Sequence, residues 1–309
     1  MVRWTRIKSR ITYLFAGSLI ACTQLSNNHN NKLSGYEAQL FKEYWYAGKA
    51  EVNSYSLIQS RYGENREGKA VLIFVTEDFS KNKQVKIDDP KKNPSDKISV
   101  LKMNFTKSFV TGIYPYSMML SAFTPINLNQ SPHTLKLSMS IQEWCGQVYA
   151  QVNLKNKQYL IAENSYFESE GDRDFTLAAT LLEDELWNLV RLQPESLPIG
   201  KINIIPGLFY TRLNHEALTS EVAICMKEER DEVVHYQITY PDQNRSLTIL
   251  FQNIFPHTIQ GWVETFQQNG KTYTTSAVLD KQLITDYWNR NKNEFLYLRD
   301  SLNLSRKNQ

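Results

Sequence analysis

The sequence predicts an α+β protein, mostly β, with a large curved antiparallel sheet or partial barrel and three helices. Two observations lead to this fold class. Segments rich in Tyr, Phe, Val, Ile and Thr recur at roughly ten-residue spacing with turn residues between them. Helical periodicity is confined to one segment near the N-terminus, one mid-chain and one at the C-terminus. With 17 Tyr and 14 Phe among 309 residues, the chain can fill a sizeable core.

The first 21 residues have the layout of a secretory signal peptide. Four basic residues and no acidic residue precede an apolar stretch over residues 11–21. That stretch is too short to cross a hydrocarbon core ~30 Å thick. It ends in Leu19-Ile20-Ala21-Cys22, which resembles the lipobox of bacterial lipoproteins. The resemblance implies cleavage before Cys22 and lipidation of Cys22, and therefore a protein held on a membrane of the cell envelope.

A polar, Asn-rich stretch follows the lipidation site. Residues 22–33 have the composition of a flexible tether, which leaves residues 34–309 as a β-rich globular body. We expect the outer membrane as the anchoring membrane, with the body in the periplasm or on the cell surface. Cleavage changes the charge from 35 basic and 32 acidic residues to 31 and 32. Because phosphate binding needs a concentrated basic face, nucleic acid is not an expected partner.

The body begins with a predicted helix over Tyr36–Tyr46, whose apolar side holds Leu40, Phe41, Tyr44 and Trp45. Strands are then predicted in the first half of the body. Among them, residues 134–141 alternate most regularly between apolar and polar side chains, so one face of that strand is buried. The predicted strands are 51–62, 69–76, 98–105, 116–123, 134–141, 147–154 and 158–162.

The mid-chain segment from Leu177 to Arg191 has leucines at three- and four-residue spacing, which predicts an amphipathic helix with Glu183, Asp184 and Glu185 on its polar side. Strands and a closing helix, 280–302, are predicted to follow. The two groups of strands are similar in size, so the body forms either one sheet packed on a helix or two lobes that meet near residues 177–195. The later strands are 201–205, 208–213, 222–226, 233–240, 246–252, 258–266 and 272–278, with turns at 241–244 and 268–270.

Three stretches are similar to a family of uncharacterised lipoproteins from Bacteroidota: residues 44–51, residues 61–79 and Gln142-Glu143-Trp144-Cys145-Gly146-Gln147. The resemblance covers most of the body and implies an outer-envelope lipoprotein without assigning an activity. Members of this family sometimes carry the label of septum formation inhibitor Maf. The Ser-rich, double-Arg motif of the Maf enzymes does not occur in this sequence, so the motifs do not support that label.

Two cysteines remain in the body, Cys145 and Cys225. An envelope location permits a disulfide between them, provided that their Cα atoms lie within about 7 Å. The alternative is two free thiols, because buried Cys often serves as a small apolar residue. The sequence around Cys145 lacks the motif of a cysteine-protease nucleophile.

An acidic run around Gly171 is the strongest candidate for a cation site. Its carboxylates are Glu168, Glu170, Asp172 and Asp174. The spacing does not fit a calcium-binding loop of the EF-hand type, and a solvated acidic loop is the favoured interpretation. The five His residues form no zinc-binding motif. The sequence therefore predicts neither a metal site nor a cofactor.

We expect a non-enzymatic envelope protein that binds an apolar ligand or an envelope protein partner. Its tryptophans either line a ligand cavity or pack in the core; they are Trp45, Trp144, Trp187, Trp262 and Trp288. One alternative is a hydrolase acting on glycan or lipid with Glu143, Glu168 or Asp172, which requires two of these carboxylates in one cleft. The other is a structural subunit of an envelope complex, which requires a large exposed apolar patch.

Overall fold

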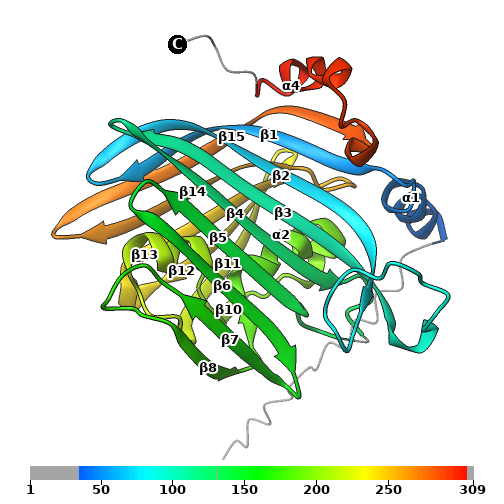
Figure 1. Ribbon diagram of the computed structural model, residues 1–309, viewed down its shortest axis with the longest axis horizontal. Helices are drawn as coiled ribbons and strands as arrows, with labels where there is room; N and C mark the ends of the chain where they lie inside the picture. The colour runs from blue at the N-terminus through cyan, green and yellow to red at the C-terminus, as the bar shows by residue number, and fades with distance from the viewer. Residues whose placement is uncertain (1–34, 130, 305–309) are drawn as a thin grey trace, which may run out of the picture.

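One curled sheet organises the molecule (Figure 1). The computed structural model describes residues 35–129 and 131–304. All 15 strands in these residues join one sheet, in the order β8-β7-β6-β5-β4-β3-β2-β1-β15-β14-β13-β12-β11-β10-β9. Neighbouring strands pair antiparallel, except that β9 and β10 run parallel. The mostly β fold class with a curved sheet is thereby confirmed.

The first half of the sheet is a meander that runs from the centre to one edge. Each strand pairs with the next one along the chain, so the chain moves steadily outward. The strands are β1 (Ala50–Arg61), β2 (Glu64–Ser80), β3 (Lys97–Thr111), β4 (Tyr114–Pro125), β5 (Lys136–Glu143), β6 (Gly146–Lys155), β7 (Gln158–Asn164) and β8 (Arg173–Ala178).

The second half starts at the opposite edge and returns to the centre, where the last strand pairs with β1. The two groups of strands are therefore halves of one sheet. The strands are β9 (Leu181–Leu182), β10 (Gly200–Ile205), β11 (Glu221–Arg230), β12 (Val233–Tyr240), β13 (Arg245–Gln252), β14 (Ile259–Gln268) and β15 (Lys271–Thr285).

The curl of the sheet follows from this topology. Its two edge strands, β8 and β9, are consecutive in the chain and are separated only by Ala179 and Thr180. The sheet must therefore bend until its edges approach each other, although it does not close. The bend creates an interior, and the helices α2 (Glu183–Leu192) and α3 (Leu208–Asn214) lie within it.

Alternating burial shows why these segments are strands. Every second residue of β12 and β13 is buried, as expected when one face of a strand meets a core and the other is partly wet. The predicted alternation in residues 134–141 is confirmed, because Leu135, Leu137, Met139 and Ile141 are all buried. The predicted turn at 268–270 is also present. Asn269 (φ 52°) and Gly270 (φ 72°) both have the positive φ that a two-residue hairpin turn requires.

The helices agree only in part with the prediction. The N-terminal helix is confirmed as α1 (Gly35–Trp45). The mid-chain helix begins only at Glu183, and Leu177, predicted to be helical, lies in β8. Residues 208–213, predicted as a strand, form α3.

The predicted helix over residues 280–302 is wrong for its first part. Residues 280–285 continue β15, where Leu283 and Thr285 pair with Val52 and Ala50 of β1. Pairing with the central strand outweighs the helical pattern. The C-terminal α4 is short (Tyr297–Ser301). The single-turn helices are η1 (Pro94–Asp96), η2 (Pro194–Ser196), η3 (Pro241–Gln243), η4 (Tyr287–Asn289) and η5 (Asn293–Phe295).

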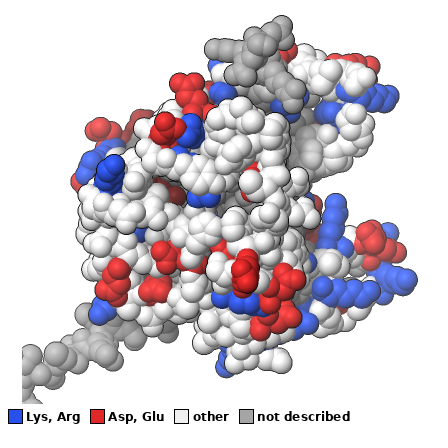
Figure 2. All heavy atoms as spheres, turned by 60° about the vertical axis from the view of Figure 1, so that its left-hand side comes forward, with Lys and Arg blue, Asp and Glu red and all other residues white. Residues whose placement is uncertain are grey.

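The surface carries mixed charge on the face that Figure 2 brings forward, which is the left-hand end of Figure 1. Acidic and basic side chains are interspersed there among larger uncharged areas. Of the helices in residues 35–129 and 131–304, none combines the length and the apolar character needed to cross a bilayer.

Candidate functional site

Helix α2 lies at the centre of the molecule, and each of its ten residues is buried. The sequence placed Glu183, Asp184 and Glu185 on a solvent-facing side, and that expectation is wrong. The curled sheet packs against the helix, so its charges are held by partners inside the protein. At 1.5 Å per residue α2 is about 15 Å long, and a hollow lies at each of its ends.

At the C-terminal end of α2, Arg191 forms a buried two-point ion pair with Glu51 of β1, with 2.5 Å between Nη2 and Oε2. Its Nε also donates to the Pro256 carbonyl at 2.9 Å. Tyr44 of α1 donates its hydroxyl to the same Glu51 carboxylate. Burial acts to raise the pKa of Glu51, but the adjacent guanidinium outweighs it and holds that pKa below the ordinary value. This cluster joins α1, α2, β1 and the segment before β14.

At the N-terminal end of α2, Glu183 forms a two-point ion pair with Arg245 of β13, with both distances 2.6 Å. Arg245 also donates to Glu264 of β14 at 2.6 and 2.8 Å. Asp184 accepts a hydrogen bond from the Leu208 N–H, the first residue of α3, at 2.9 Å. Burial raises the pKa of Asp184 to about 7, and the neighbouring Glu183 acts in the same direction.

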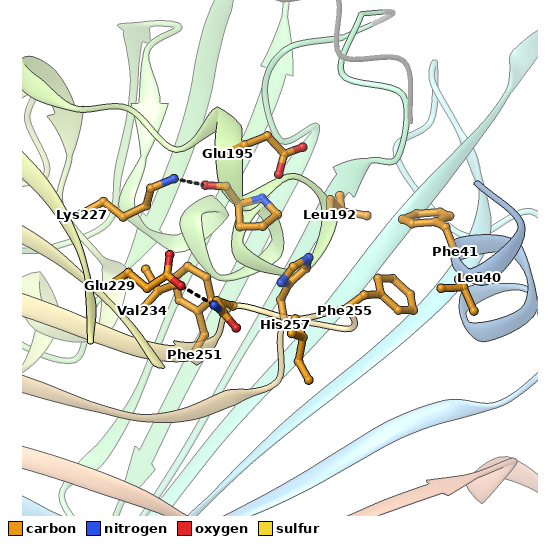
Figure 3. A pocket seen from close by; sticks show the side chains of 13 residues that line it. Leu40, Phe41, Leu192, Glu195, Lys227, Glu229, Val234, Phe251, Phe255 and His257 are labelled. Carbon is orange, nitrogen blue, oxygen red and sulfur yellow. Dashed lines mark hydrogen bonds between the residues drawn. The ribbon is translucent and has the colours of Figure 1, made fainter. Parts of the chain in front are cut away.

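The largest of the hollows lies beyond the C-terminal end of α2, and we call it the α1 groove (Figure 3). Its volume is about 840 Å³, within the range of about 300–1,000 Å³ that small-molecule sites occupy. It lies between α1, the η2 segment, the ends of β11 to β13 and residues 253–257. The lining residues are Leu40, Phe41, Leu192, Pro194, Glu195, Lys227, Glu229, Val234, Phe251, Asn253, Ile254, Phe255 and His257.

Aromatic contacts hold α1 in place as one wall of the groove. Phe255 packs on Phe41 and Tyr44, with ring centroids 6.4 and 5.5 Å apart. Trp45, at the end of α1, packs edge-on against Phe74 of β2 at 6.5 Å. Such aromatic pairs contribute about 0.5–1.5 kcal/mol each beyond their burial. The wall is therefore fixed to the sheet, while Leu40 and Phe41 still face the hollow.

The α1 groove has an apolar side next to α1 and a polar side opposite it (Figure 3). Phe251 and Val234 are buried beneath the groove, and two of its three charged side chains are engaged with protein partners. Lys227 donates to the Pro194 carbonyl at 3.3 Å, and Glu229 accepts from the Asn253 amide. Figure 3 shows both interactions on the side of the groove away from α1.

His257 is the titratable side chain nearest the middle of the α1 groove (Figure 3). Its backbone has a positive φ of 59°. Its Nδ1 lies 3.2 Å from the Gln252 carbonyl, which can only accept, so Nδ1 carries the proton. Burial lowers the pKa of His257. The ring is therefore neutral at pH 7 and adds a polar but uncharged atom to the groove.

The acidic run predicted as a candidate cation site lies in the loop before β8, except for Asp174, which belongs to β8. Among the described residues, no cluster of His, Cys, Asp and Glu is arranged to hold a metal ion. Glu168, Asp172 and Asp174 are exposed. Glu170 instead connects the loop to α3, with Nη1 of Arg212 at 2.8 Å and Nδ1 of His215 at 2.6 Å from its Oε1.

The carboxylates of the hydrolase alternative are not brought together in the hollows that we describe. Glu143 borders a small hollow of about 20 Å³ at the β5–β6 turn. Its Oε2 accepts the Cys145 N–H at 2.7 Å. Glu168 and Asp172 lie on the exposed acidic loop.

The disulfide left open by the sequence is not formed, because Cys145 and Cys225 both carry free thiols. Cys145 is exposed in the β5–β6 turn, whereas Cys225 is fully buried in β11. Cys22 lies outside the described residues.

The tryptophans do not line the α1 groove. Trp45, Trp187 and Trp262 are buried in the core, while Trp144 and Trp288 are exposed. The groove depends instead on Phe41, Phe251, Phe255 and His257, of which the sequence pattern marked only Phe41, on the apolar side of the predicted N-terminal helix. The available signal was Asn253-Ile254-Phe255-Pro256-His257, an apolar pair inside a proline-containing link between two strands.

Comparison with known protein families finds no match, and no curated protein is similar in sequence. The resemblance to Bacteroidota lipoproteins therefore stays a prediction. The function must be argued from the site itself.

Proposed function

We propose that the protein is a lipid-anchored envelope protein that binds an apolar ligand in the α1 groove without chemically altering it. The observation that carries the proposal is the groove itself, a hollow of about 840 Å³ with an apolar side of phenylalanines and aliphatic side chains and its charged side chains on the opposite side (Figure 3). A hollow of this kind excludes water from an apolar ligand, and each buried methylene of the ligand contributes about 0.8 kcal/mol.

Binding, rather than catalysis, follows from the state of the polar groups. Lys227 and Glu229 are already engaged with protein partners. His257 donates its one proton to the backbone. The lining contains no Ser, Thr or Cys that could serve as a nucleophile for covalent catalysis.

The groove's position suits a ligand that comes from a membrane. The predicted lipidation site, Cys22, precedes the first residue of α1, Gly35, by a stretch of chain that can extend at most about 45 Å. Because α1 is one wall of the groove, the anchor keeps the groove within that distance of the bilayer. We therefore expect the ligand to be an acyl chain or another lipid-soluble molecule.

The test uses the fluorescent apolar amine N-phenyl-1-naphthylamine as a probe. Ile254 lines the groove and is 61% exposed, so Ile254→Glu places a charge in the groove at little cost in stability. Ile199→Glu is the matched control, because Ile199 is similarly exposed (66%) but is not part of the lining.

We expect the probe to bind the wild type and the Ile199→Glu variant with similar affinity, and Ile254→Glu at least tenfold more weakly. Palmitate should displace the probe. Equal binding by all three proteins, or no binding by the wild type, would contradict the proposal. If the wild type does not bind the probe but binds a purified envelope protein, the result would favour the protein-partner alternative.

A further inference from the structure

A second hollow lies at the other end of α2, between the inward face of the sheet and α3, and we call it the Lys107 cavity. Its volume is about 360 Å³. It is lined by Gln59, Ser60, Arg61, Tyr62, Gly63, Lys107, Phe209, Tyr210, Leu213, Asn214, His215, Glu264, Phe266, Gln268 and Tyr273. It shares no lining residue with the α1 groove.

The cavity is lined by a lysine that has no polar partner in the protein. Lys107 is 5% exposed, yet within residues 35–129 and 131–304 its ammonium makes neither a hydrogen bond nor an ion pair. Its Nζ lies 5.3, 5.4 and 5.9 Å from the ring centroids of Phe105, Phe209 and Trp262. Burial lowers the pKa of Lys107, because the low-dielectric surroundings disfavour its charged form.

The neighbouring carboxylates act on Lys107 through space, but none of them forms a direct ion pair with it. Glu264 lines the cavity, but its Oε1 accepts two hydrogen bonds from Arg245. Both oxygens of Glu183 are bound by Arg245 as well. The fourth ionisable group, Asp184, has its pKa raised by burial to about 7 and is largely protonated below that pH. A ligand carboxylate entering the cavity would give Lys107 the direct hydrogen-bonded partner that these engaged side chains do not provide.

Two further lining residues carry buried polar atoms without a partner. One is the Arg61 Nε, a donor; the other is the Gln59 Oε1, an acceptor. The orientation of the Gln59 amide is fixed, because its Nε2 donates to the Ser60 carbonyl at 3.1 Å, and a carbonyl can only accept. Buried polar groups are nearly always satisfied in folded proteins, so unsatisfied ones at one cavity point to a ligand.

These groups specify the chemistry of the ligand. A cationic donor and a guanidinium N–H require an anion, while a buried amide oxygen requires a donor such as a hydroxyl. Tyr210, Phe266 and Tyr273 supply flat aromatic surface; Phe266 and Tyr273 stack with centroids 5.4 Å apart, and Tyr210 meets Phe266 edge-on at 6.0 Å. We propose that the Lys107 cavity is a second binding site, which takes a small hydroxylated carboxylate such as a sugar acid.

In this site Lys107 and Arg61 hold the carboxylate, Gln59 accepts from a hydroxyl, and the aromatic rings cover the apolar face of the ligand. The inference does not depend on the α1 groove. Each site is tested with its own probe and its own variants, so either binding proposal can be refuted while the other stands.

The test is isothermal titration of the full chain with D-glucuronate and, as a neutral match, D-glucose. The two differ in having a carboxylate or a hydroxymethyl group on the same ring. We expect glucuronate to bind at least tenfold more tightly than glucose. Lys107→Met should weaken glucuronate binding roughly 10- to 100-fold, the loss of a charge-assisted hydrogen bond, and leave glucose unaffected.

Gln59→Leu should weaken both sugars and keep the preference for the acid. The exposed Lys271→Met serves as the matched control and should bind glucuronate like the wild type. Lys107→Met should fold, because methionine suits the aromatic surroundings of the side chain. Equal affinity of the wild type for the two sugars, no binding of glucuronate, or unchanged binding by a folded Lys107→Met variant would each overturn the proposal.

Discussion

Replacing Asp184 by Asn should stabilise the folded protein at pH 8 much more than at pH 5. Asp184 is buried, and its pKa of about 7 lies well above the ordinary value of 3.8. Between these two values the unfolded chain loses its proton while the folded protein keeps it. Stability is therefore lost as the pH rises through that window. Asn cannot ionise, so it escapes the penalty, and its side-chain oxygen can still accept the Leu208 N–H.

The magnitude follows from the size of the pKa shift. One pKa unit corresponds to about 1.36 kcal/mol, so the two units between pH 5 and pH 7 amount to about 3 kcal/mol. Above pH 7 the effect levels off. The stability gained by Asp184→Asn should therefore grow by about 3 kcal/mol from pH 5 to pH 8. The charges facing Asp184, which are Glu183, Arg245 and Lys107, are the same in both proteins and largely cancel in the difference.

The assay is urea unfolding followed by circular dichroism, at pH 5 and pH 8. Asp174→Asn makes the same chemical change at an exposed position of β8 and serves as the matched control. A gain for Asp184→Asn that is equal at the two pH values would refute the assignment of a proton to this buried carboxyl.

Three further predictions concern the rest of the chain. Arg191→Met leaves Glu51 buried without its partner and should lower the free energy of unfolding by about 3–5 kcal/mol. Adding Glu51→Leu to that variant should restore much of the lost stability. Equal losses in the single and double variants would argue against a paired charge. Cys22→Ser should abolish metabolic labelling with radioactive palmitate and release the protein from membranes, and retained labelling would refute the lipobox assignment. In the Cys22→Ser variant, Ellman's reagent should react with Cys145 within minutes and with Cys225 only after unfolding. The reason is that Cys225 is fully buried and that burial raises the pKa of its thiol. Rapid reaction of both thiols in the folded protein would contradict the packing of β11.

Local patterns predicted the parts of the fold that depend on local physics. The alternation from Leu135 to Ile141 gave a strand, because one face of it meets a core. Asn269 and Gly270 gave a hairpin turn, because both tolerate positive φ. The apolar side of α1 was also identified, because it repeats at helical spacing.

The parts that failed depend on partners far away in the chain. Glu183, Asp184 and Glu185 look like the wet side of a helix until their partners, Arg245 among them, are placed around them. The segment after Asp280 has a helical pattern, but it pairs as a strand with the free edge of β1, on the side opposite β2.

The candidate sites were beyond sequence reasoning for the same reason. The α1 groove exists because Phe41 and Phe255, at opposite ends of the chain, pack together. The Lys107 cavity depends on Gln59 and Arg61 of β1 and on Lys107 of β3, which the sheet brings to one surface across β2. No spacing within a single segment signals either arrangement.

The most direct test of ligand binding in the α1 groove is native mass spectrometry of the protein purified from its own membranes. The wild type and Ile199→Glu should both carry a reproducible extra mass that organic solvent removes, and Ile254→Glu should lack it. A wild type without any extra mass, or an extra mass that Ile254→Glu retains, would contradict the proposal that this groove holds an apolar ligand.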